Sequence, residues 1–158
     1  MNVATYIREV KIEEEIKQEE FASSRQKAMV NILFTSSWLS SLHLHLLKPF
    51  NVSMQQFNVL RILRGQHPEP ASITLVSQRM LDKNSNASRL VDKLLDKELI
   101  KRKICKQDRR QKDVVITEKG LALLLQIDES LKDLENKISH LSDEEAEQLS
   151  GLLDQLRG

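Results

Sequence analysis

Residues 84–117 of the chain follow an order that few folds accommodate: a helical pattern, a β-prone run, a basic loop and a second β-prone run. Spacings of three and four predict one buried face of a helix, formed by Ala87, Leu90, Val91, Leu94 and Leu95. The β-prone residues on the two sides of the loop from Cys105 to Asp113 are Leu99, Ile100 and Ile104, then Val114, Val115 and Ile116. Because this loop lacks glycine and is too long for a two-residue turn, we predict a helix followed by an open β-hairpin.

Positive charge is concentrated in the same segment. Between Asn84 and Lys112 there are ten basic and four acidic side chains, a net charge of +6, whereas the whole chain of 158 residues carries only +1. A local patch of this kind attracts polyanions even when the whole chain is almost neutral. A charged face that only serves solubility is the alternative, and the helix and hairpin patterns favour a nucleic-acid surface instead.

A second, shorter helical pattern precedes this helix. It runs from around Ser72 or Thr74 to Leu81 and is followed by a polar break at Asp82 to Ser85. Two short helices separated by a tight polar break form a helix-turn-helix, although an ordinary helical hairpin gives the same pattern. Near its N-terminus the polar face of the second helix holds small hydrogen-bonding residues and Arg89, as a recognition helix that reaches base edges requires. The whole polar face consists of Ser85, Asn86, Ser88, Arg89, Asp92, Lys93 and Asp96.

The side chains of the loop also indicate a nucleic-acid partner. Its basic residues are Lys106, Arg109, Arg110 and Lys112, with Asp108 among them. Arginine side chains on such a loop can enter a narrow minor groove, whose negative potential favours them. Asp108 can hold one guanidinium group in place, because a planar guanidinium pairs well with a carboxylate.

A long helical segment lies before the helix-turn-helix. No proline or glycine occurs from about Val10 to Lys48, and a heptad stripe is formed by Ala28, Ile32, Thr35, Leu39, Leu42 and Leu46. The acidic start of this segment, residues 13–20, is expected to be solvated, and Pro49 ends the helix. Ser53 and Gln56 then resemble a capping box for a short helix that ends near Gly65.

Two further helices are predicted after the hairpin. Thr117 can cap the first, whose apolar stripe is Leu124, Ile127, Leu131, Leu134, Ile138 and Leu141. Ser142 and Glu145 form a capping box for the second, which carries Leu149, Leu152, Leu153 and Leu156. The DNA-binding module needs no such stripes for its own core, so the helices at both ends predict a two-fold dimer. Packing of these stripes within one chain is the alternative.

Four runs of residues share a pattern with a known family. They are Asn86 to Leu94, Leu99 to Arg102, Asp108-Arg109-Arg110, and Val114 to Gly120. Together they resemble the winged helix-turn-helix of the MarR family of transcriptional regulators, over roughly residues 53 to 120. The resemblance implies a mostly α-helical fold with a small β-hairpin wing, flanked by N- and C-terminal dimerisation helices. The expected parts of this one continuous domain are residues 1–48, 49–117 and 118–158.

The resemblance also implies a function. It describes a dimeric, cytoplasmic regulator that binds double-stranded DNA at a pseudo-palindromic operator, most often a repressor released by a small molecule. Arg110 is then the wing arginine for the minor groove, with Asp108 as its brace. The residues expected to face the major groove are Ser85, Asn86, Ser88, Arg89 and Lys93. Lys106, Arg109 and Lys112 complete the expected DNA-binding surface.

Two positions depart from the family pattern. Glu98 stands where a glycine usually separates the recognition helix from the first wing strand, and Leu81 stands where the preceding helix often ends in glycine. These substitutions put the geometry of both turns in doubt. Trp38, His45, Met54 and Phe57 could line a cleft for an effector, and we assign them to the core instead.

Other classes of function find little support. No nucleophile and base arrangement stands out and only four glycines are present, so neither an enzyme nor a cofactor is expected. His43 and His45 point in different directions on a helix, which argues against a metal site. Cys105 is taken as a structural wing residue, and a single cysteine suits the cytoplasm. Two alternatives stay open: a winged-helix module that binds an acidic protein, and a nucleoid-type binder without sequence preference.

Overall fold

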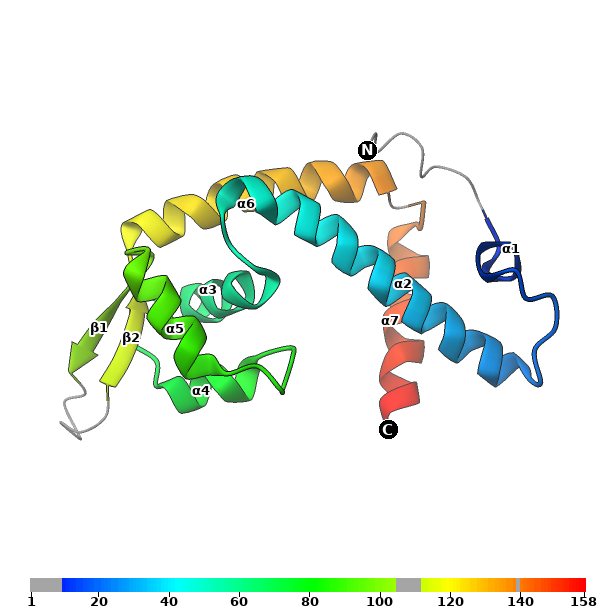
Figure 1. The fold of residues 1–158 in the computed structure, drawn as a ribbon, viewed down its shortest axis with the longest axis horizontal. Helices are drawn as coiled ribbons and strands as arrows, with labels where there is room; N and C mark the ends of the chain where they lie inside the picture. Colours follow the sequence, from blue (N-terminus) through cyan, green and yellow to red (C-terminus); the bar gives the residue numbers. More distant parts are fainter. Residues whose placement is uncertain (1–9, 105–111, 139) are drawn as a thin grey trace.

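The computed structural model describes residues 10–104, 112–138 and 140–158, which form a mostly helical fold with one β-hairpin (Figure 1). One lobe contains helices α3 (Met54–Gln66), α4 (Ile73–Arg79) and α5 (Ala87–Asp96) and strands β1 (Ile100–Ile104) and β2 (Lys112–Ile116). The long helices α2 (Ser24–Leu47) and α6 (Glu118–Ile138) extend from this lobe, and α7 (Asp143–Arg157) lies beyond the far end of α6. The predicted fold class, a winged helix-turn-helix with helical flanks, is confirmed.

The N-terminal segment is not the single helix expected between Val10 and Lys48. It divides into α1 (Ile12–Ile16) and α2, and a short 3-10 helix (Lys48–Phe50) follows. Lys17 ends α1 in a left-handed conformation at φ 55°, and Ser23 caps α2 by accepting a hydrogen bond from the N–H of Gln26. Lys27 on α2 pairs with Glu13, and this hydrogen bond lowers the pKa of the Glu13 carboxyl from its ordinary value. The expected solvated extension is therefore tied to the start of α2.

The hydrophobic core lies almost entirely in the lobe. Its fully buried side chains come from α3, α4, α5, the hairpin and α6, and include Leu60, Leu63, Val76, Met80, Val91, Leu94, Val114, Leu124 and Ile127. Helix α2 contributes one buried residue, Leu47, and α7 contributes none. Phe57 is buried as expected, whereas His45 is exposed on α2 and not part of the core. The lobe therefore folds around its own core, and the helical arms extend beyond it.

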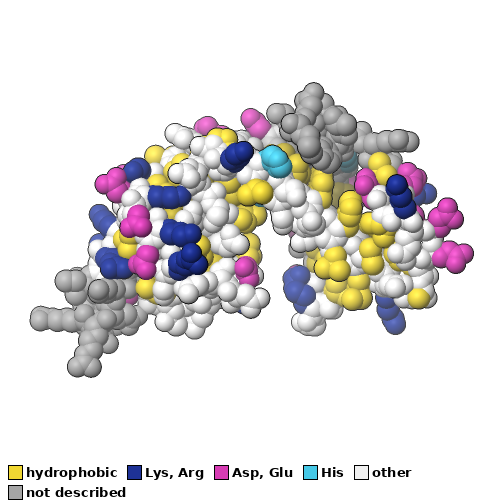
Figure 2. Space-filling model, viewed as in Figure 1, with side chains coloured by type: hydrophobic (Ala, Val, Ile, Leu, Met, Phe, Trp, Pro, Cys, Tyr) yellow, Lys and Arg dark blue, Asp and Glu magenta, His cyan; other side chains and the backbone are white. Residues whose placement is uncertain are grey.

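Large apolar side chains are exposed on the arms. They are Met29, Leu33 and Phe34 on α2, and Leu149, Leu152 and Leu156 on α7. Figure 2 shows hydrophobic side chains gathered at this end of the molecule, away from the lobe. A helix with apolar residues around its whole circumference is normally buried, so α2 exposes more apolar surface than a single chain explains. None of the described helices is both long and apolar enough to cross a membrane.

The hairpin is antiparallel, with Ile100 opposite Ile116 and Ile104 opposite Lys112. Asp113, which was expected in the loop, belongs to β2 opposite Lys103. The segment before α4 joins the hairpin edge, because Ala71 and Val114 exchange backbone hydrogen bonds of 2.8 and 2.9 Å. This bridge joins the second wing strand to the segment just before α4.

Side-chain caps begin three helices as the sequence predicts. Ser53 and Gln56 form a complete capping box at α3, and Ser142 and Glu145 form another at α7. Hydrogen bonds from Ser142 lower the pKa of the Glu145 carboxyl. Thr117 caps α6, since its hydroxyl accepts the N–H of Gly120 at 3.1 Å. Leu141, expected in the stripe of this helix, lies beyond its end.

Candidate nucleic-acid interface

Helix α5 shows two chemically different faces. Ala87, Val91 and Leu94 are buried in the core, which anchors the helix to α3 and α4. On the other side Ser88, Arg89, Asp92 and Lys93 are exposed, as the sequence predicts. The helix therefore presents a hydrogen-bonding, partly basic surface while its backbone is held rigidly from behind.

The turn between α4 and α5 corrects the placement of two predicted residues. Ser85 lies in the turn before α5, where its hydroxyl donates a hydrogen bond to Asp82 Oδ2 at 2.8 Å. Asn86 is the N-cap of α5, and its side-chain oxygen accepts the N–H of Arg89 at 3.0 Å. Asp82 also accepts the N–H of Asn84 at 3.0 Å, so this acid organises the turn. Both predicted residues lie beside the exposed face of α5 without belonging to its helical surface.

Leu81 shows how this turn forms without the glycine that the family usually has at this point. Its N–H donates to Asn58 Oδ1 on α3 at 2.9 Å, so this backbone donor beyond the end of α4 has a partner on α3. The chain leaves α4 at Met80 in an extended conformation, with φ −63° and ψ 140°, which any residue can adopt. The leucine side chain itself is 82% exposed.

The wing residues are only partly described. Lys106, Asp108, Arg109 and Arg110, together with Cys105, lie outside the described residues, so their roles in the wing stay predictions. Lys112 is the first residue of β2. The structure therefore places the base of the wing beside α5. The minor-groove contact expected for the loop is inferred from the sequence alone.

A group of polar residues on α4 was missed by the sequence analysis. Thr74, Ser77 and Gln78 line a surface hollow of about 410 Å³, together with Ile73 and with Ser85 to Ser88 at the start of α5. Their spacing of three and four places them on one face of α4, and this periodicity could have indicated them. The hollow joins α4 to the exposed face of α5 in one continuous polar surface.

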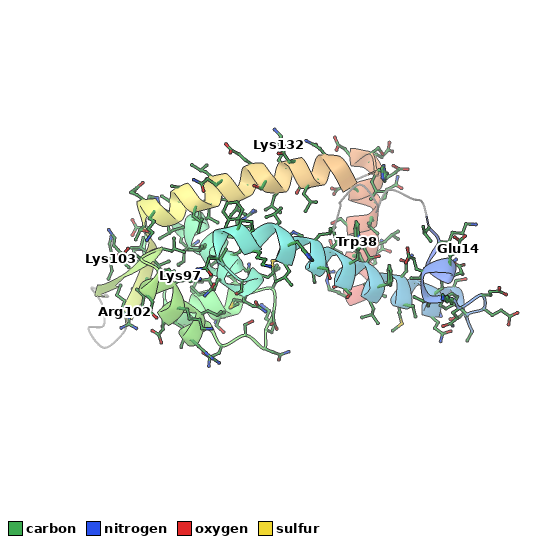
Figure 3. The ribbon with its side chains drawn as sticks, turned by 45° about the horizontal axis from the view of Figure 1, so that its top comes forward. Glu14, Trp38, Lys97, Arg102, Lys103 and Lys132 are labelled. Carbon is green, nitrogen blue, oxygen red and sulfur yellow. The ribbon has the colours of Figure 1, made fainter. Side chains whose placement is uncertain are left out.

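Basic side chains also extend from α5 onto the wing. Arg102 on β1 pairs with Asp92 on α5, with 2.7 Å between Nη2 and Oδ1. Lys101 and Lys103 on the same strand are exposed. Figure 2 shows Lys and Arg side chains gathered over this part of the lobe, with acidic side chains between them, and Figure 3 places Arg102 and Lys103 at β1. The predicted basic patch therefore includes the first wing strand.

The end of α5 is a Schellman motif in which glutamate stands at the position that usually holds glycine. The N–H of Leu99 donates to Leu94 O at 3.1 Å, and the N–H of Glu98 donates to Leu95 O at 2.8 Å. Glu98 adopts φ 60°, the left-handed conformation that this motif requires. The replacement of the usual glycine by Glu98 therefore leaves the turn geometry unchanged, and a non-glycine residue adopts the left-handed conformation.

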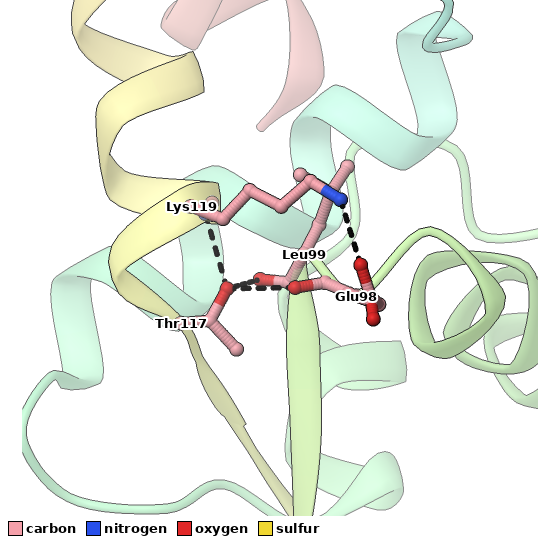
Figure 4. A network of polar contacts seen from close by, with 5 residues as sticks. Glu98, Leu99, Thr117 and Lys119 are labelled. Atoms are coloured by element: carbon pink, nitrogen blue, oxygen red, sulfur yellow. Dashed lines mark hydrogen bonds and ion pairs between the residues drawn. The ribbon is translucent and has the colours of Figure 1, made fainter.

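Glu98 also joins α5 to α6, as Figure 4 shows. Lys119 Nζ lies 3.0 Å from Glu98 Oε2, and the Thr117 hydroxyl lies 2.9 Å from Glu98 O and 3.0 Å from Leu99 O. The left-handed conformation costs a non-glycine residue about 1–2 kcal/mol. The side chains of Lys119 and Glu98 are 59% and 81% exposed, and a pair this exposed contributes about 0–1 kcal/mol. The ion pair therefore does not fully offset the backbone cost.

Gly120 is required at this junction by close packing. A Cβ at this position would lie 2.3 Å from Leu99 O and 2.7 Å from Ile116 Cγ1. We expect Gly120→Ala to lower the free energy of unfolding by about 1–3 kcal/mol, because the backbone must shift to remove this overlap. Urea unfolding measures the change.

Gly65 provides the matched control for that substitution. It lies in α3 and a Cβ there would meet no atom within 4 Å. Gly65→Ala is expected to raise the free energy of unfolding by up to about 1 kcal/mol, through helix propensity alone. A Gly120→Ala protein as stable as the unmodified chain would contradict the packing described for the junction.

A charged cluster connects α3 to α6 on another side of the lobe. Asp128 on α6 pairs with Arg64 and, at 3.4 Å, with Arg61, both on α3. The Arg61 guanidinium carbon also lies 5.7 Å from the centre of the Phe57 ring. These contacts complement the apolar packing of α6 on the lobe through Leu124 and Ile127.

Comparison with known proteins agrees with this architecture. Residues 52–112 match the model of the MarR family. A MarR transcription factor from Planctomyces limnophilus is 29% identical, with a TM-score of 0.65, and the match covers 86% of this chain and 99% of that one. A putative MarR-like transcription regulator from Bacillus cereus is 20% identical, with a TM-score of 0.72 and coverage of 84% and 95%. S. aureus MepR in a complex with DNA is 21% identical, with a TM-score of 0.72 and coverage of 85% and 96%.

The lobe, its exposed α5 face and the adjoining hairpin define a winged helix-turn-helix protein. Its residues 52–112 match the MarR family model, and the chain is similar in sequence and fold to MarR transcription regulators.

Proposed function

We propose that the protein is a dimeric transcription regulator that binds a specific sequence of double-stranded DNA. The observation that carries this proposal is the anchored α5, whose polar face is exposed next to the base of the wing. An α-helix fits the major groove of B-DNA, and residues near its N-terminus contact base edges. MepR, a structural relative, has been crystallised in a complex with DNA, which supports the proposal by similarity of fold.

The proposed contacts follow from the geometry of the lobe. Ser88, Arg89 and Lys93 face the major groove from α5, and Asn86 can donate from its amide nitrogen while its oxygen caps the helix. We propose that Ser85 contacts the phosphate backbone and not the major groove, together with Thr74 and Ser77 on α4, which line the same hollow. The residues proposed for the minor groove and its phosphates are Lys106, Arg109, Arg110 and Lys112, with Asp108 as a brace.

We propose that the second copy covers the exposed apolar side chains of α2 and α7. The arms, within residues 1–48 and 118–158, then form a self-complementary interface about a two-fold axis. Two copies of α5 separated by about 34 Å would contact successive major grooves, which predicts a pseudo-palindromic operator. As a repressor, the dimer would exclude the transcription machinery from that operator.

A groove beside α5 supports the proposed release by a small molecule. It has a volume of about 780 Å³ and lies between the end of α2, the start of α3 and the second half of α5. Its wall includes apolar Leu44, Val52 and Leu90, and its charged residues are Lys48, Lys93, Lys97 and Asp96. This volume is in the range of small-molecule sites, and three ammonium groups favour an anion with an apolar body. Such a ligand would lie beside Lys93, one of the proposed DNA contacts, and would alter the approach of α5 to DNA.

A panel of aromatic and aliphatic carboxylates is therefore expected to contain compounds that weaken operator binding. Lys48→Gln removes one ammonium group of the groove, in the short 3-10 helix after α2, at a residue that is not one of the proposed DNA contacts. This variant should bind the operator normally and respond less to the active carboxylates, as measured by fluorescence anisotropy. If no member of the panel changes operator affinity, the proposed effector class is wrong.

Selection of bound fragments from genomic DNA of the source organism tests the function. The purified protein is expected to enrich a small set of fragments that share an inverted repeat. Enrichment without a shared sequence would instead indicate a nucleoid-type binder. Absence of any enrichment at low salt would indicate a winged-helix module for an acidic protein partner.

A further inference from the structure

We infer that Glu98 and Lys119 form a positioning pair that sets the orientation of α5 relative to α6. The inference rests on the proposed function, because it assigns to this pair a role in DNA binding. It concerns a glutamate in a left-handed turn, where glycine is the more favourable residue.

The junction connects α5, the wing and α6 within a few residues. Glu98 ends α5, Leu99 leads into β1, and Thr117 to Gly120 lead from β2 into α6. Backbone contacts alone already hold the two wing ends together, since the N–H of Thr117 donates to Leu99 O at 3.1 Å. The Glu98 carboxylate adds a contact of a different kind, because it reaches the first turn of α6 through Lys119.

The stability of the fold does not explain why a glutamate occupies position 98. Its left-handed backbone is unfavourable, and the exposed ion pair returns at most part of that cost. Strained residues of this kind are concentrated where geometry matters for function. The carboxylate is therefore assigned a geometric role: it limits rotation of the recognition helix about its C-terminal end relative to α6.

The assignment predicts an effect opposite to that of simple electrostatics. Glu98→Gln removes a negative charge from the DNA-binding lobe, which by itself should strengthen binding to a polyanion. If the pair positions α5, the same change should weaken operator binding instead. We expect about threefold weaker binding per subunit, within the range that one exposed ion pair can supply, and about tenfold for a dimer with two junctions.

The experiment measures operator affinity for the full-length protein, Glu98→Gln, Lys119→Gln and the double variant. The two single substitutions should each weaken binding, and the double variant should be no weaker than either, because both remove the same contact. The dependence of affinity on salt should keep the same slope in Glu98→Gln, since no phosphate contact is lost. Tighter or unchanged binding by Glu98→Gln would overturn the inference.

Glu98→Gly separates the positioning role from a structural one. It relieves the left-handed strain, so its melting temperature should rise by about 2–4 °C while operator affinity falls. Lys17→Gly is the matched control, because it relieves the same strain at φ 55° in α1, far from the lobe, and should leave affinity unchanged. A Glu98→Gly protein that is more stable and binds as tightly would overturn the inference. Absence of operator binding by the unmodified protein would instead refute the proposed function.

Discussion

A protein that carries Leu152→Glu and Leu156→Glu together is expected to be monomeric and to lose operator binding. Both leucines lie on α7, where they are 62% and 61% exposed in the single chain. Burying one such side chain contributes about 1.5–3 kcal/mol to the free energy of association. A two-fold interface buries both leucines in each of the two subunits. The substitution removes this apolar contact and adds charges that the interface would have to desolvate. Sedimentation equilibrium measures the association, and anisotropy with the operator measures binding.

A control variant adds the same negative charge to α7 and leaves its exposed leucines unchanged. Gln148→Glu with Gln155→Glu places two negative charges at exposed positions of the same helix. This protein should remain dimeric and should bind the operator almost normally. A leucine double variant that stays dimeric would contradict the proposed use of α7. A monomer that retained full operator affinity would contradict the two-fold arrangement on DNA.

Arg89→Ala is expected to weaken operator binding more than any other single substitution on α5. Arg89 is exposed in the first turn of α5, where a bidentate contact with a guanine edge is possible. Loss of one such contact costs about 1–3 kcal/mol, and a dimer loses it in both half-sites. Lys132→Ala, on α6 away from the lobe, removes one positive charge elsewhere and serves as the control (Figure 3).

The pattern of the loss distinguishes a base contact from a phosphate contact. If Arg89 contacts a base, the variant should lose discrimination at one position of each half-site. If it contacts a phosphate, affinity should fall equally for all sequences and the salt slope should decrease by about 1 per contact. An Arg89→Ala protein with the affinity of the Lys132→Ala control would contradict the proposed contact of Arg89 with the operator.

The features that the sequence predicted correctly are those set by short-range physics. Ser53 with Gln56 and Ser142 with Glu145 are capping boxes whose partners lie three residues apart, so the pattern alone identifies them. The apolar stripe of α5 was equally clear, because one helix face needs no knowledge of its neighbours. The order of helix, strand, loop and strand then followed from the change in periodicity.

The incorrect expectations depended on contacts between distant residues or on exact turn geometry. The break between α1 and α2 depends on a left-handed Lys17 and on the pair between Glu13 and Lys27, neither of which has a sequence signature. Ser85 and Asn86 were placed on the helix because their types suit a recognition face. Their hydrogen bonds to Asp82 and to the Arg89 backbone assign them to the turn and the cap.

Tertiary pairs at the candidate site could not be inferred from sequence. Asp92 and Arg102 belong to different elements, and so do Arg64 and Asp128. Their pairing depends on how the wing and α6 pack against the lobe. The role of Gly120 is of the same kind, because it is set by the approach of the Leu99 carbonyl. The family motif included Asp92, Arg102 and Gly120 without giving the contact that explains each of them.

The most direct test of the account is the specificity ratio for a selected operator. Affinity for that operator and for a scrambled duplex of equal length would be measured at the same salt concentration, since both depend on salt. A sequence-specific dimer is expected to bind the operator at least about 10³ times more tightly than the scrambled duplex. A ratio close to 1 would contradict the account, whatever the absolute affinity for DNA.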